Sequence, residues 1–246
     1  MKAVVLSAGQ GKRLLPLTAR SPKCLLPVRD DAVVLGLQLH TLARCGVARA
    51  LVVVGFGVER VEAWLDANPV PGLAVETLYN PFYGSSDNLM TCWLARGAFG
   101  EDVLLLNGDT LFDGAVLQRL LDAAPAPVTI AIDDKPHYDD DDMKVSLDER
   151  GRVLAIDKGL PPAMVGAEAI GLSLFRGSGP KLFVGALERA VRRPDAMRRW
   201  YLSVIHRMAR TTAIETVDIE GLWWREVDSH DDLTGVRRDL APHAPR

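Results

Sequence analysis

Apolar residues along the chain fall into two kinds of pattern, continuous runs and helical spacings. Short continuous runs, which are typical of strands buried on both faces, occur at residues 3–6, 50–54, 103–106 and 128–132. Helical spacings predict helices at residues 32–45, 58–67, 86–96 and 114–123. Because strands and helices alternate, the pattern predicts a Rossmann-like α/β fold with a doubly wound, mostly parallel sheet.

The pattern changes after about residue 133. An acidic stretch leads into a predicted hairpin and one further strand, at residues 144–147, 153–156 and 169–175. We expect these strands to be antiparallel additions that make the sheet mixed. The remaining pattern predicts helices and strands at residues 181–191, 199–209, 214–219, 223–227 and 231–240. Since no linker interrupts the sequence, we predict a single domain with a frayed tail at residues 241–246.

Composition narrows the class of protein. The 246 residues are 48% hydrophobic, which is enough to fill the core of one α/β domain. The 29 basic and 32 acidic residues nearly cancel, so we expect no nucleic-acid partner. No apolar run approaches the roughly 20 residues of a membrane helix, and no signal peptide is recognisable. Because the three cysteines also lack a C-x-x-C pattern, we expect a cytoplasmic protein with reduced thiols and no membrane partner.

The sequence LSAGQGKRL, at residues 6–14, follows the first predicted strand and has the character of a phosphate-binding loop. It lacks the third glycine of a dinucleotide-binding turn, and it lacks the first glycine and the hydroxyl residue of a P-loop. Gly9 and Gly11 still allow backbone N–H groups to surround an anion, and Lys12 and Arg13 supply positive charge. Lys23 adds a cation on a loop stiffened by a proline. Together these residues predict a polyphosphate site.

The longer stretch LSAGQGKRLLPLTARSPK resembles the L-A-A-G-x-G-x-R-L-x-P-L-T-x-x-x-P-K signature of the sugar-phosphate nucleotidyltransferases, and only Ser7 departs from it. The resemblance implies a GT-A-like nucleotidyltransferase fold, in which residues 1–133 bind the nucleotide and residues 134–240 bind the acceptor. It implies that residues 6–11 surround the base and ribose, that Arg13 holds the β- and γ-phosphates, and that Lys23 lies where the α-phosphate meets the acceptor. These two cations are the expected catalytic residues. The expected nucleotide-binding residues are Leu6, Ala8, Gly9, Gly11, Lys12, Arg13, Asn88 and Asp109.

Two carboxylates are the candidates for a metal site. Asp109 lies just beyond the buried strand at residues 103–106, at the edge where open α/β sheets bind ligands. Asp228 ends another predicted strand, and Glu226 points the same way from it. The resemblance implies that Asp109 and Asp228 hold one Mg²⁺, since family members use an aspartate in a G-D segment and an acidic residue in a segment like E-V-D-S. Mg²⁺ typically takes one or two carboxylates together with substrate phosphates.

No residue pattern indicates a general base or a nucleophile. The five histidines show no ligand spacing, and no nucleophile motif is present. A phosphate or phosphonate acceptor, with a second pKa of roughly 6, is already an anion at neutral pH. The predicted reaction is therefore an in-line attack of the acceptor on the nucleotide α-phosphorus, with Mg²⁺, Lys23 and Arg13 offsetting the developing charge.

The compact chain is similar to the cytidylyltransferases that activate small phosphorylated alcohols, and this similarity implies CTP as the nucleotide. Bacterial phosphocholine cytidylyltransferases are the nearest type, but they have a tryptophan where this chain has Met143, so an aromatic cage for choline is not indicated. Inositol 1-phosphate and 2-aminoethylphosphonate stay open as acceptors. The alternatives are a sugar-1-phosphate nucleotidyltransferase that uses UTP, dTTP or GTP and a regulatory protein that binds nucleotide without turnover. A homodimer is also left open.

The candidates for contact with the acceptor are Asp142, Lys144, Tyr201 and Glu226. Asp142 belongs to an acidic run that is either solvated or meets a cationic headgroup. Lys144 either neutralises a neighbouring carboxylate or reaches the acceptor phosphate. Trp200 and Tyr201 are adjacent on a predicted helix, so only one of them can face the cleft squarely, and Tyr201 is the candidate.

Replacing Lys23 tests the predicted electrostatic role. We expect Lys23→Ala to lower turnover by a factor on the order of 10² or more, because a preorganised charge at the reacting phosphate is lost. Steady-state pyrophosphate release measures this effect. A variant with near-normal turnover would refute the assignment.

Overall fold

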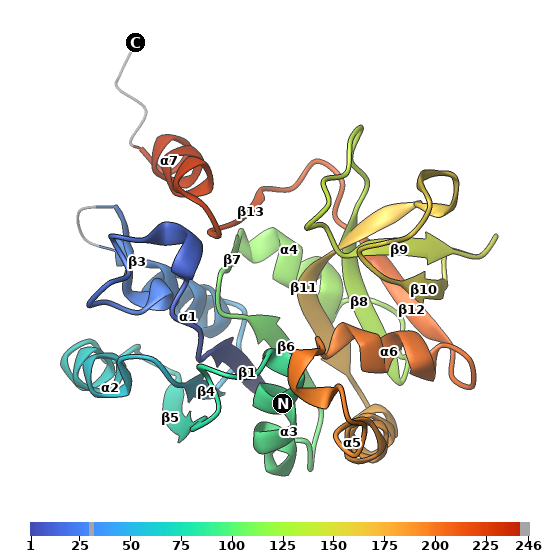
Figure 1. Cartoon of the computed structure of the whole chain (residues 1–246), viewed down its shortest axis with the longest axis horizontal. Helices are drawn as coiled ribbons and strands as arrows, with labels where there is room; N and C mark the ends of the chain where they lie inside the picture. The colour runs from blue at the N-terminus through green and yellow to red at the C-terminus, as the bar shows by residue number, and fades with distance from the viewer. Residues whose placement is uncertain (30–31, 242–246) are drawn as a thin grey trace.

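The computed structural model describes residues 1–29 and 32–241 (Figure 1). A nine-stranded sheet forms its centre, and four strands of that sheet are parallel neighbours. β1 (Lys2–Ser7) lies between β4 (Arg49–Val54) and β6 (Val103–Asn107), and β5 (Ala74–Tyr79) follows β4 at the edge. The carboxyl ends of these strands meet at one edge of the sheet, where ligands bind in folds of this kind.

The other strands make the sheet mixed, which confirms the predicted fold class. β11 (Ala167–Phe175) is antiparallel to both β6 and β8 (Val128–Asp133), and β12 (Ile214–Asp218) continues in parallel with β8. The predicted hairpin is present as β9 (Lys144–Leu147) and β10 (Val153–Ile156), and β9 pairs with the first residues of β11. A single sheet therefore runs through both halves of the chain.

A glycine bends β11 beside the edge where β6 ends. Gly171 has φ of +80°, and the register between β11 and β8 shifts between Ala169 and Ser173. A Cβ atom on Gly171 would lie 2.6 Å from the Asn107 amide nitrogen, so only glycine fits there. The bend lets the second half of β11 pair with β6 while its first half, which carries Glu168, pairs with β9.

Helices cover both faces of the sheet, as the alternation of β1 requires. Ala3 and Val5 point to the face covered by α1 (Val34–Arg44), α2 (Val58–Ala67) and α4 (Gly114–Leu121). Val4 points to the opposite face, which is covered by α3 (Asn88–Leu94), α5 (Gly179–Ala190) and α6 (Leu202–Met208). Within the described residues, no helix has both the length and the apolar character needed to cross a membrane.

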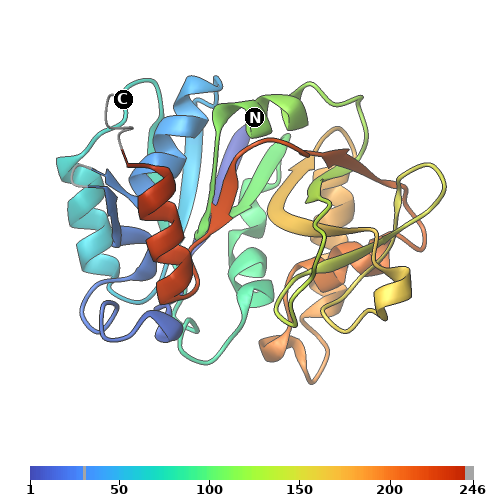
Figure 2. The same cartoon turned by 90° about the horizontal axis from the view of Figure 1, so that it is seen from above.

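Short elements complete the fold. Figure 2 shows the chain crossing from β12 in one half of the molecule to α7 (His230–Asp239) in the other. On the way it forms β13 (Trp224–Glu226), which pairs antiparallel with β7 (Thr110–Phe112). A second two-stranded pair consists of β2 (Pro27–Arg29) and β3 (Ala32–Val33). The 3-10 helices are Lys12–Leu14, Lys23–Leu25, Ala95–Ala98, Pro162–Met164 and Ala196–Arg198.

The structure differs from the predicted elements in a few places. β5 was not predicted, because an edge strand that is partly exposed along its length has no continuous apolar run. The helix expected at residues 199–209 begins only at Leu202. The residues before it bond to another helix instead, because the carbonyls of Met197 and Arg199 accept hydrogen bonds from the N–H groups of Asp87 and Leu89 at the start of α3. The tail expected to fray lies outside the described residues, except for Ala241. The division into a nucleotide-binding and an acceptor-binding part stays a prediction.

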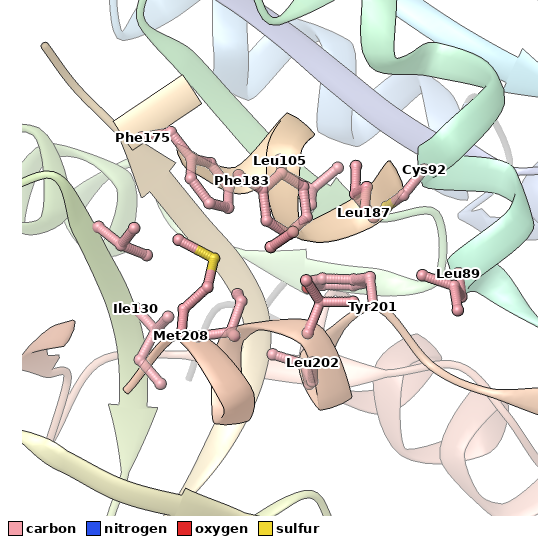
Figure 3. Close-up of a cluster of buried hydrophobic side chains, with 14 of the residues drawn as sticks. Leu89, Cys92, Leu105, Ile130, Phe175, Phe183, Leu187, Tyr201, Leu202 and Met208 are labelled. Atoms are coloured by element: carbon pink, nitrogen blue, oxygen red, sulfur yellow. The ribbon is translucent and has the colours of Figure 1, made fainter. Parts of the chain in front are cut away.

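Three phenylalanines anchor the core between α5 and the sheet. The Phe183 ring stacks on Phe175 with the ring centroids 4.4 Å apart, and its centroid lies 5.2 Å from that of Phe99. All three side chains are buried, and Figure 3 shows Phe175 and Phe183 within this cluster. We expect Phe183→Ala to lower the free energy of unfolding by about 3–5 kcal/mol, because a large buried ring is lost and a cavity remains.

The neighbouring residue provides the control for this prediction. Leu182 is 41% exposed on the same helix, so Leu182→Ala should change the free energy of unfolding by no more than about 0.5 kcal/mol. Urea denaturation of both variants measures the difference. Equal destabilisation of the two variants would contradict the assigned packing.

Candidate active site

The loop after β1 brings a buried lysine to the edge of the sheet. Gly11 takes the left-handed conformation, with φ of +77°, and its carbonyl accepts a hydrogen bond from Thr18 Oγ1 at 2.8 Å. A Cβ atom on Gly11 would lie 2.9 Å from Cβ of Lys23, so the glycine leaves room for the lysine side chain to pass. The loop sequence therefore positions the cation as well as offering backbone N–H groups.

The ammonium of Lys23 lies between two carboxylates. Its Nζ is 2.6 Å from Asp109 Oδ2 and 2.5 Å from Asp228 Oδ1, and the lysine side chain is only 14% exposed. Burial acts to lower the pKa of Lys23, but the two aspartates outweigh it and raise that pKa. Burial likewise acts to raise the pKa of Asp228, but Lys23 lowers it on balance. We call Lys23, Asp109 and Asp228 the Lys23 triad.

Backbone pairing explains why two distant aspartates meet. Asp109 lies between β6 and β7. Because β7 pairs with β13, the residues that follow β13 lie alongside Asp109, and Val227 N–H donates to the Asp109 carbonyl at 3.0 Å. Asp228 is then fixed at the start of α7. The backbone N–H groups of Asp228 and Ser229 both donate to Asp232 Oδ2, and Ser229 closes a capping box.

Arg13 adds a second cation beside the Lys23 triad. One guanidinium nitrogen is 2.8 Å from Asp228 Oδ2, and the other bonds Asp141 in the loop before β9. Asp141 in turn lies 3.0 Å from Nζ of Lys158. Both expected catalytic cations, Arg13 and Lys23, are therefore paired with carboxylates of the protein itself.

A pocket of about 220 Å³ lies beside Lys23 at the carboxyl end of β1, and we call it the β1 pocket. It brings together several of the residues expected at the nucleotide, namely Leu6, Ala8, Gly9, Asn88 and Asp109. The other expected residues, Gly11, Lys12 and Arg13, line an adjoining hollow of about 330 Å³ that also contains Gly9 and Asp228. The two hollows share Tyr83, Ser86 and Asp87, to which the sequence reasoning assigned no role in the site.

The prediction for Tyr201 was wrong in orientation. Its side chain has no exposed surface and packs with Leu89 and Leu202 in the core, as Figure 3 shows. Trp200 lines the β1 pocket instead, with Lys158 Nζ 4.7 Å from its ring centroid. The cause is the segment before α6, where Tyr201 N–H donates to Asn88 Oδ1 at 2.9 Å and thereby fixes which ring turns inward.

Lys144 also lies differently from the expectation. It is 8% exposed, and its ammonium donates to the backbone carbonyls of Asp139 and Lys158, the latter at 2.9 Å. These bonds tie the acidic loop to the segment after β10. Within residues 1–29 and 32–241, Lys144 therefore pairs with no carboxylate, and it does not line the β1 pocket or the adjoining hollow.

A cavity of about 560 Å³ is lined by Asp228 of the Lys23 triad, and we call it the acidic cavity. It contains Asp142 and Glu226, both expected near the acceptor, together with Arg13 and Asp228. Burial, followed by the charges of Asp109 and Asp228, raises the pKa of Glu226 well above its usual value. The other lining residues are Asp133, Lys135, Asp139, Asp140, Asp141, Glu168, Trp224, Arg225, Ser229 and Asp232.

Sequence reasoning missed Lys135 and Glu168 in this cavity. Glu168 carried a usable signal, because it is the one charged residue in the otherwise apolar or small-residue strand AEAIGLSLF. No comparable signal marked Lys135, which lies in a polar loop. Across residues 1–29 and 32–241, no group of three or more His, Cys, Asp or Glu side chains is arranged as a metal site.

The chain matches one protein family over most of its length. The model of the MobA-like NTP transferase domain aligns with residues 3–206. The chain belongs to this family. The resemblance to nucleotidyltransferases predicted from residues 6–23 is thereby confirmed, although the alignment ends before β13 and Asp228.

Proteins that are similar to this chain in sequence or in fold are named for different acceptors. CMP-5'-(3-aminopropyl)phosphonate synthase of Streptomyces rubellomurinus is 39% identical over 131 residues, which are 53% of this chain and 20% of that protein. CTP:phosphocholine cytidylyltransferase of Streptococcus pneumoniae has the same fold, with a TM-score of 0.74, 18% identity and 97% and 98% of the two chains covered. A Bacillus anthracis protein that is assigned by name as a glucose-1-phosphate thymidylyltransferase aligns with a TM-score of 0.80, 14% identity and 100% and 98% coverage. The chain spans about half the length, or less, of the curated relatives it matches.

The two aromatic residues at the start of α6 give a direct test of the site. We expect Trp200→Ala to lower kcat/KM on the order of tenfold, because a wall of the β1 pocket is lost, and Tyr201→Phe to leave kcat/KM close to that of the wild type. Pyrophosphate release measures both variants, and thermal unfolding checks that they fold. A large catalytic loss in Tyr201→Phe alone would show that the tyrosine hydroxyl reaches the substrate after all.

Proposed function

We propose that this MobA-like NTP transferase transfers CMP from CTP to the phosphate or phosphonate group of a small amine-bearing headgroup and releases pyrophosphate. The observation that carries the proposal is that the Lys23 triad borders both hollows, since Lys23 and Asp109 line the β1 pocket and Asp228 lines the acidic cavity. One hollow is polar and built around the loop after β1, whereas the other is dominated by carboxylates. A nucleotide in the first and a zwitterionic acceptor in the second would meet at Lys23.

The proposed chemistry needs no base from the protein. An oxygen of the acceptor phosphate or phosphonate forms a bond to the α-phosphorus, and the bond from that phosphorus to the bridging oxygen breaks, so pyrophosphate leaves with the electron pair. Lys23 would neutralise charge at the α-phosphate, and Arg13 would hold the leaving phosphates. Both cations must first exchange their aspartate partners for phosphate oxygens.

The donor set fits a magnesium ion. Asp109 and Asp228 already converge on one positive group, and the buried Oδ1 of Asp109 has no hydrogen-bond partner among the described residues. Two carboxylates completed by substrate phosphates suit Mg²⁺, which retains part of its hydration and prefers oxygen ligands. When bound, Mg²⁺ would supply Lewis-acid stabilisation of the phosphate charge.

The choice of CTP and of an amine-bearing acceptor rests on the relatives and on charge. The name of the Streptomyces relative specifies a CMP-linked aminoalkylphosphonate, and that of the Streptococcus structure a CTP:phosphocholine reaction. A cavity lined mainly by carboxylates favours an acceptor that carries a positive group. The three cysteines are free thiols, which supports a reducing compartment such as the cytoplasm.

A sugar-1-phosphate acceptor is the alternative supported by a specific observation, the fold shared with the Bacillus thymidylyltransferase. Sugar hydroxyls also donate to carboxylates, but a sugar phosphate brings no cation to balance the acidic cavity. A purely regulatory role is less favoured, because nucleotide binding alone would not require both carboxylates of the Lys23 triad.

Pyrophosphate release from a grid of substrates tests the proposal. Five nucleotides, CTP, UTP, GTP, dTTP and ATP, are combined with 2-aminoethylphosphonate, 3-aminopropylphosphonate, phosphoethanolamine, phosphocholine, inositol 1-phosphate and glucose 1-phosphate in Mg²⁺. We expect turnover with CTP and an amine-bearing acceptor. Turnover confined to glucose 1-phosphate would instead place the enzyme with the sugar activators, and nucleotide binding without turnover would favour the regulatory alternative.

Loss of the proposed metal site should have a distinct signature. We expect EDTA to abolish turnover and Asp228→Asn to lower it by a factor on the order of 10², because metal stabilisation of the phosphate charge is worth several kcal/mol. Asp231→Asn removes the same charge from an exposed position in α7 and is the control. Full activity of Asp228→Asn, or of the wild type in EDTA, would contradict the assignment.

A further inference from the structure

Acidic side chains outnumber basic ones around the acidic cavity, even when Lys23 and Lys158, which pair with Asp228 and Asp141, are counted. The cavity is lined by three basic residues, Arg13, Lys135 and Arg225, and by nine acidic ones, Asp133, Asp139, Asp140, Asp141, Asp142, Glu168, Glu226, Asp228 and Asp232. Glu226 has neither an ion pair nor a side-chain hydrogen bond among the described residues, although it lies close to Asp109, Asp228 and Glu168. The charge therefore points to a positively charged occupant.

The protein itself shows which kind of cation this cavity accepts. Nζ of Lys135 lies 2.5 Å from Glu168 Oε2 and 2.8 Å from Asp142 Oδ2. Glu168 is 3% exposed and is held by β11, and Asp142 is fixed by the hydrogen bond that its Oδ2 accepts from Asp139 N–H at 2.7 Å. A primary ammonium group is thus seated on two fixed carboxylates inside the cavity.

The electrostatics of the pair agree with this geometry. Burial raises the pKa of Glu168 to about 7 and Lys135 acts to lower it, so an ammonium in contact with Glu168 favours the charged form of the carboxylate. The Lys135 side chain is 27% exposed and belongs to the loop between β8 and β9, so it can leave toward solvent. Glu168 cannot move in the same way, because both flanking residues are buried in the sheet.

We propose that Glu168 and Asp142 are the specificity-determining residues that bind the primary ammonium group of the acceptor, and that Lys135 occupies their site when no acceptor is bound. This inference rests on the proposed function and specifies its acceptor. The acceptor's phosphorus group would lie at the Lys23 triad and its ammonium at Glu168. When the acceptor binds, its ammonium group displaces Lys135, and the flexible lysine side chain then extends into solvent.

The same cavity disfavours a quaternary ammonium. A trimethylated nitrogen cannot donate hydrogen bonds to carboxylates and is typically bound by several aromatic faces. Trp224 is the single aromatic side chain that lines the acidic cavity within the described residues, and its Nε1 donates to Asp133 at 2.7 Å. The lining therefore selects a primary amine over choline.

A pair of matched acceptors tests the proposal in the full-length protein. 3-Aminopropylphosphonate and butylphosphonate have the same chain length and differ by an ammonium in place of a methyl group. With CTP and Mg²⁺, we expect the wild type to prefer the amine in kcat/KM by a factor on the order of 10² or more, because the isostere leaves buried polar groups unpaired. Glu168→Gln should reduce this preference at least tenfold through KM for the amine, with little change for butylphosphonate.

Three further variants complete the design. Asp142→Asn should also reduce the preference for the amine over butylphosphonate. It replaces Glu168→Gln in the test if that variant does not fold. Lys135→Met should keep the preference and lower KM for the amine, because the internal competitor is gone. Glu149→Gln, on the exposed turn between β9 and β10, removes a carboxylate outside the cavity and is the control.

The outcomes separate this inference from the proposed function. If Glu168→Gln lowers kcat/KM for both acceptors equally, the residue is structural and the inference is overturned. If the wild type turns over CTP with butylphosphonate, inositol 1-phosphate or phosphocholine as well as with the amine, the inference fails while cytidylyl transfer stands. If no acceptor is used with CTP, both fail.

Discussion

The active centre depends on the contact of one ammonium group with two carboxylates, the Lys23 triad. A lysine this deeply buried is stable as a cation only because Asp109 and Asp228 face it, and each aspartate would be costly to bury without the lysine. Three distant parts of the chain must be in place for this contact: the loop after β1, the β6–β7 turn, and the segment between β13 and α7. The glycine at position 11 and the pairing of β7 with β13 serve the same purpose, since both bring these groups within ion-pair distance.

The same contact explains how the site is kept intact without substrate. Arg13 and Lys23 carry the charges that would bind phosphates, and in the structure protein carboxylates take the place of those phosphates. Under the proposed function, substrate binding would therefore be an exchange of ion pairs and not the filling of an empty charged site. An exchange of this kind costs less than exposing unpaired charges, but it weakens the binding of any anion that does not bring its own counter-ion.

How far the sequence predicts this molecule depends on whether a feature is local. The runs that become β1, β4 and β6, the hairpin of β9 and β10, and the glycine-rich loop are readable because each carries its own pattern over a few residues. The edge strand β5 was missed because partial exposure removes that pattern. Trp200 and Tyr201 show the limit more sharply. Their spacing says that only one ring faces the cleft, but a hydrogen bond to Asn88, 113 residues away in sequence, decides which. Lys144 was misjudged for the same reason, since backbone carbonyls from two separate segments bind its ammonium.

Asp141 links the two halves of the site, because it bonds Arg13 on one side and Lys158 on the other. An anion that binds Arg13 competes directly with Asp141 for the guanidinium. Asp141 belongs to the same loop as Asp142, which holds Lys135 in the acidic cavity. Loss of the Arg13 contact therefore removes one of the restraints on the loop that carries an internal ammonium. Because these contacts share a single short segment, a phosphate bound at Arg13 would also act on the loop that holds Lys135 in the acidic cavity.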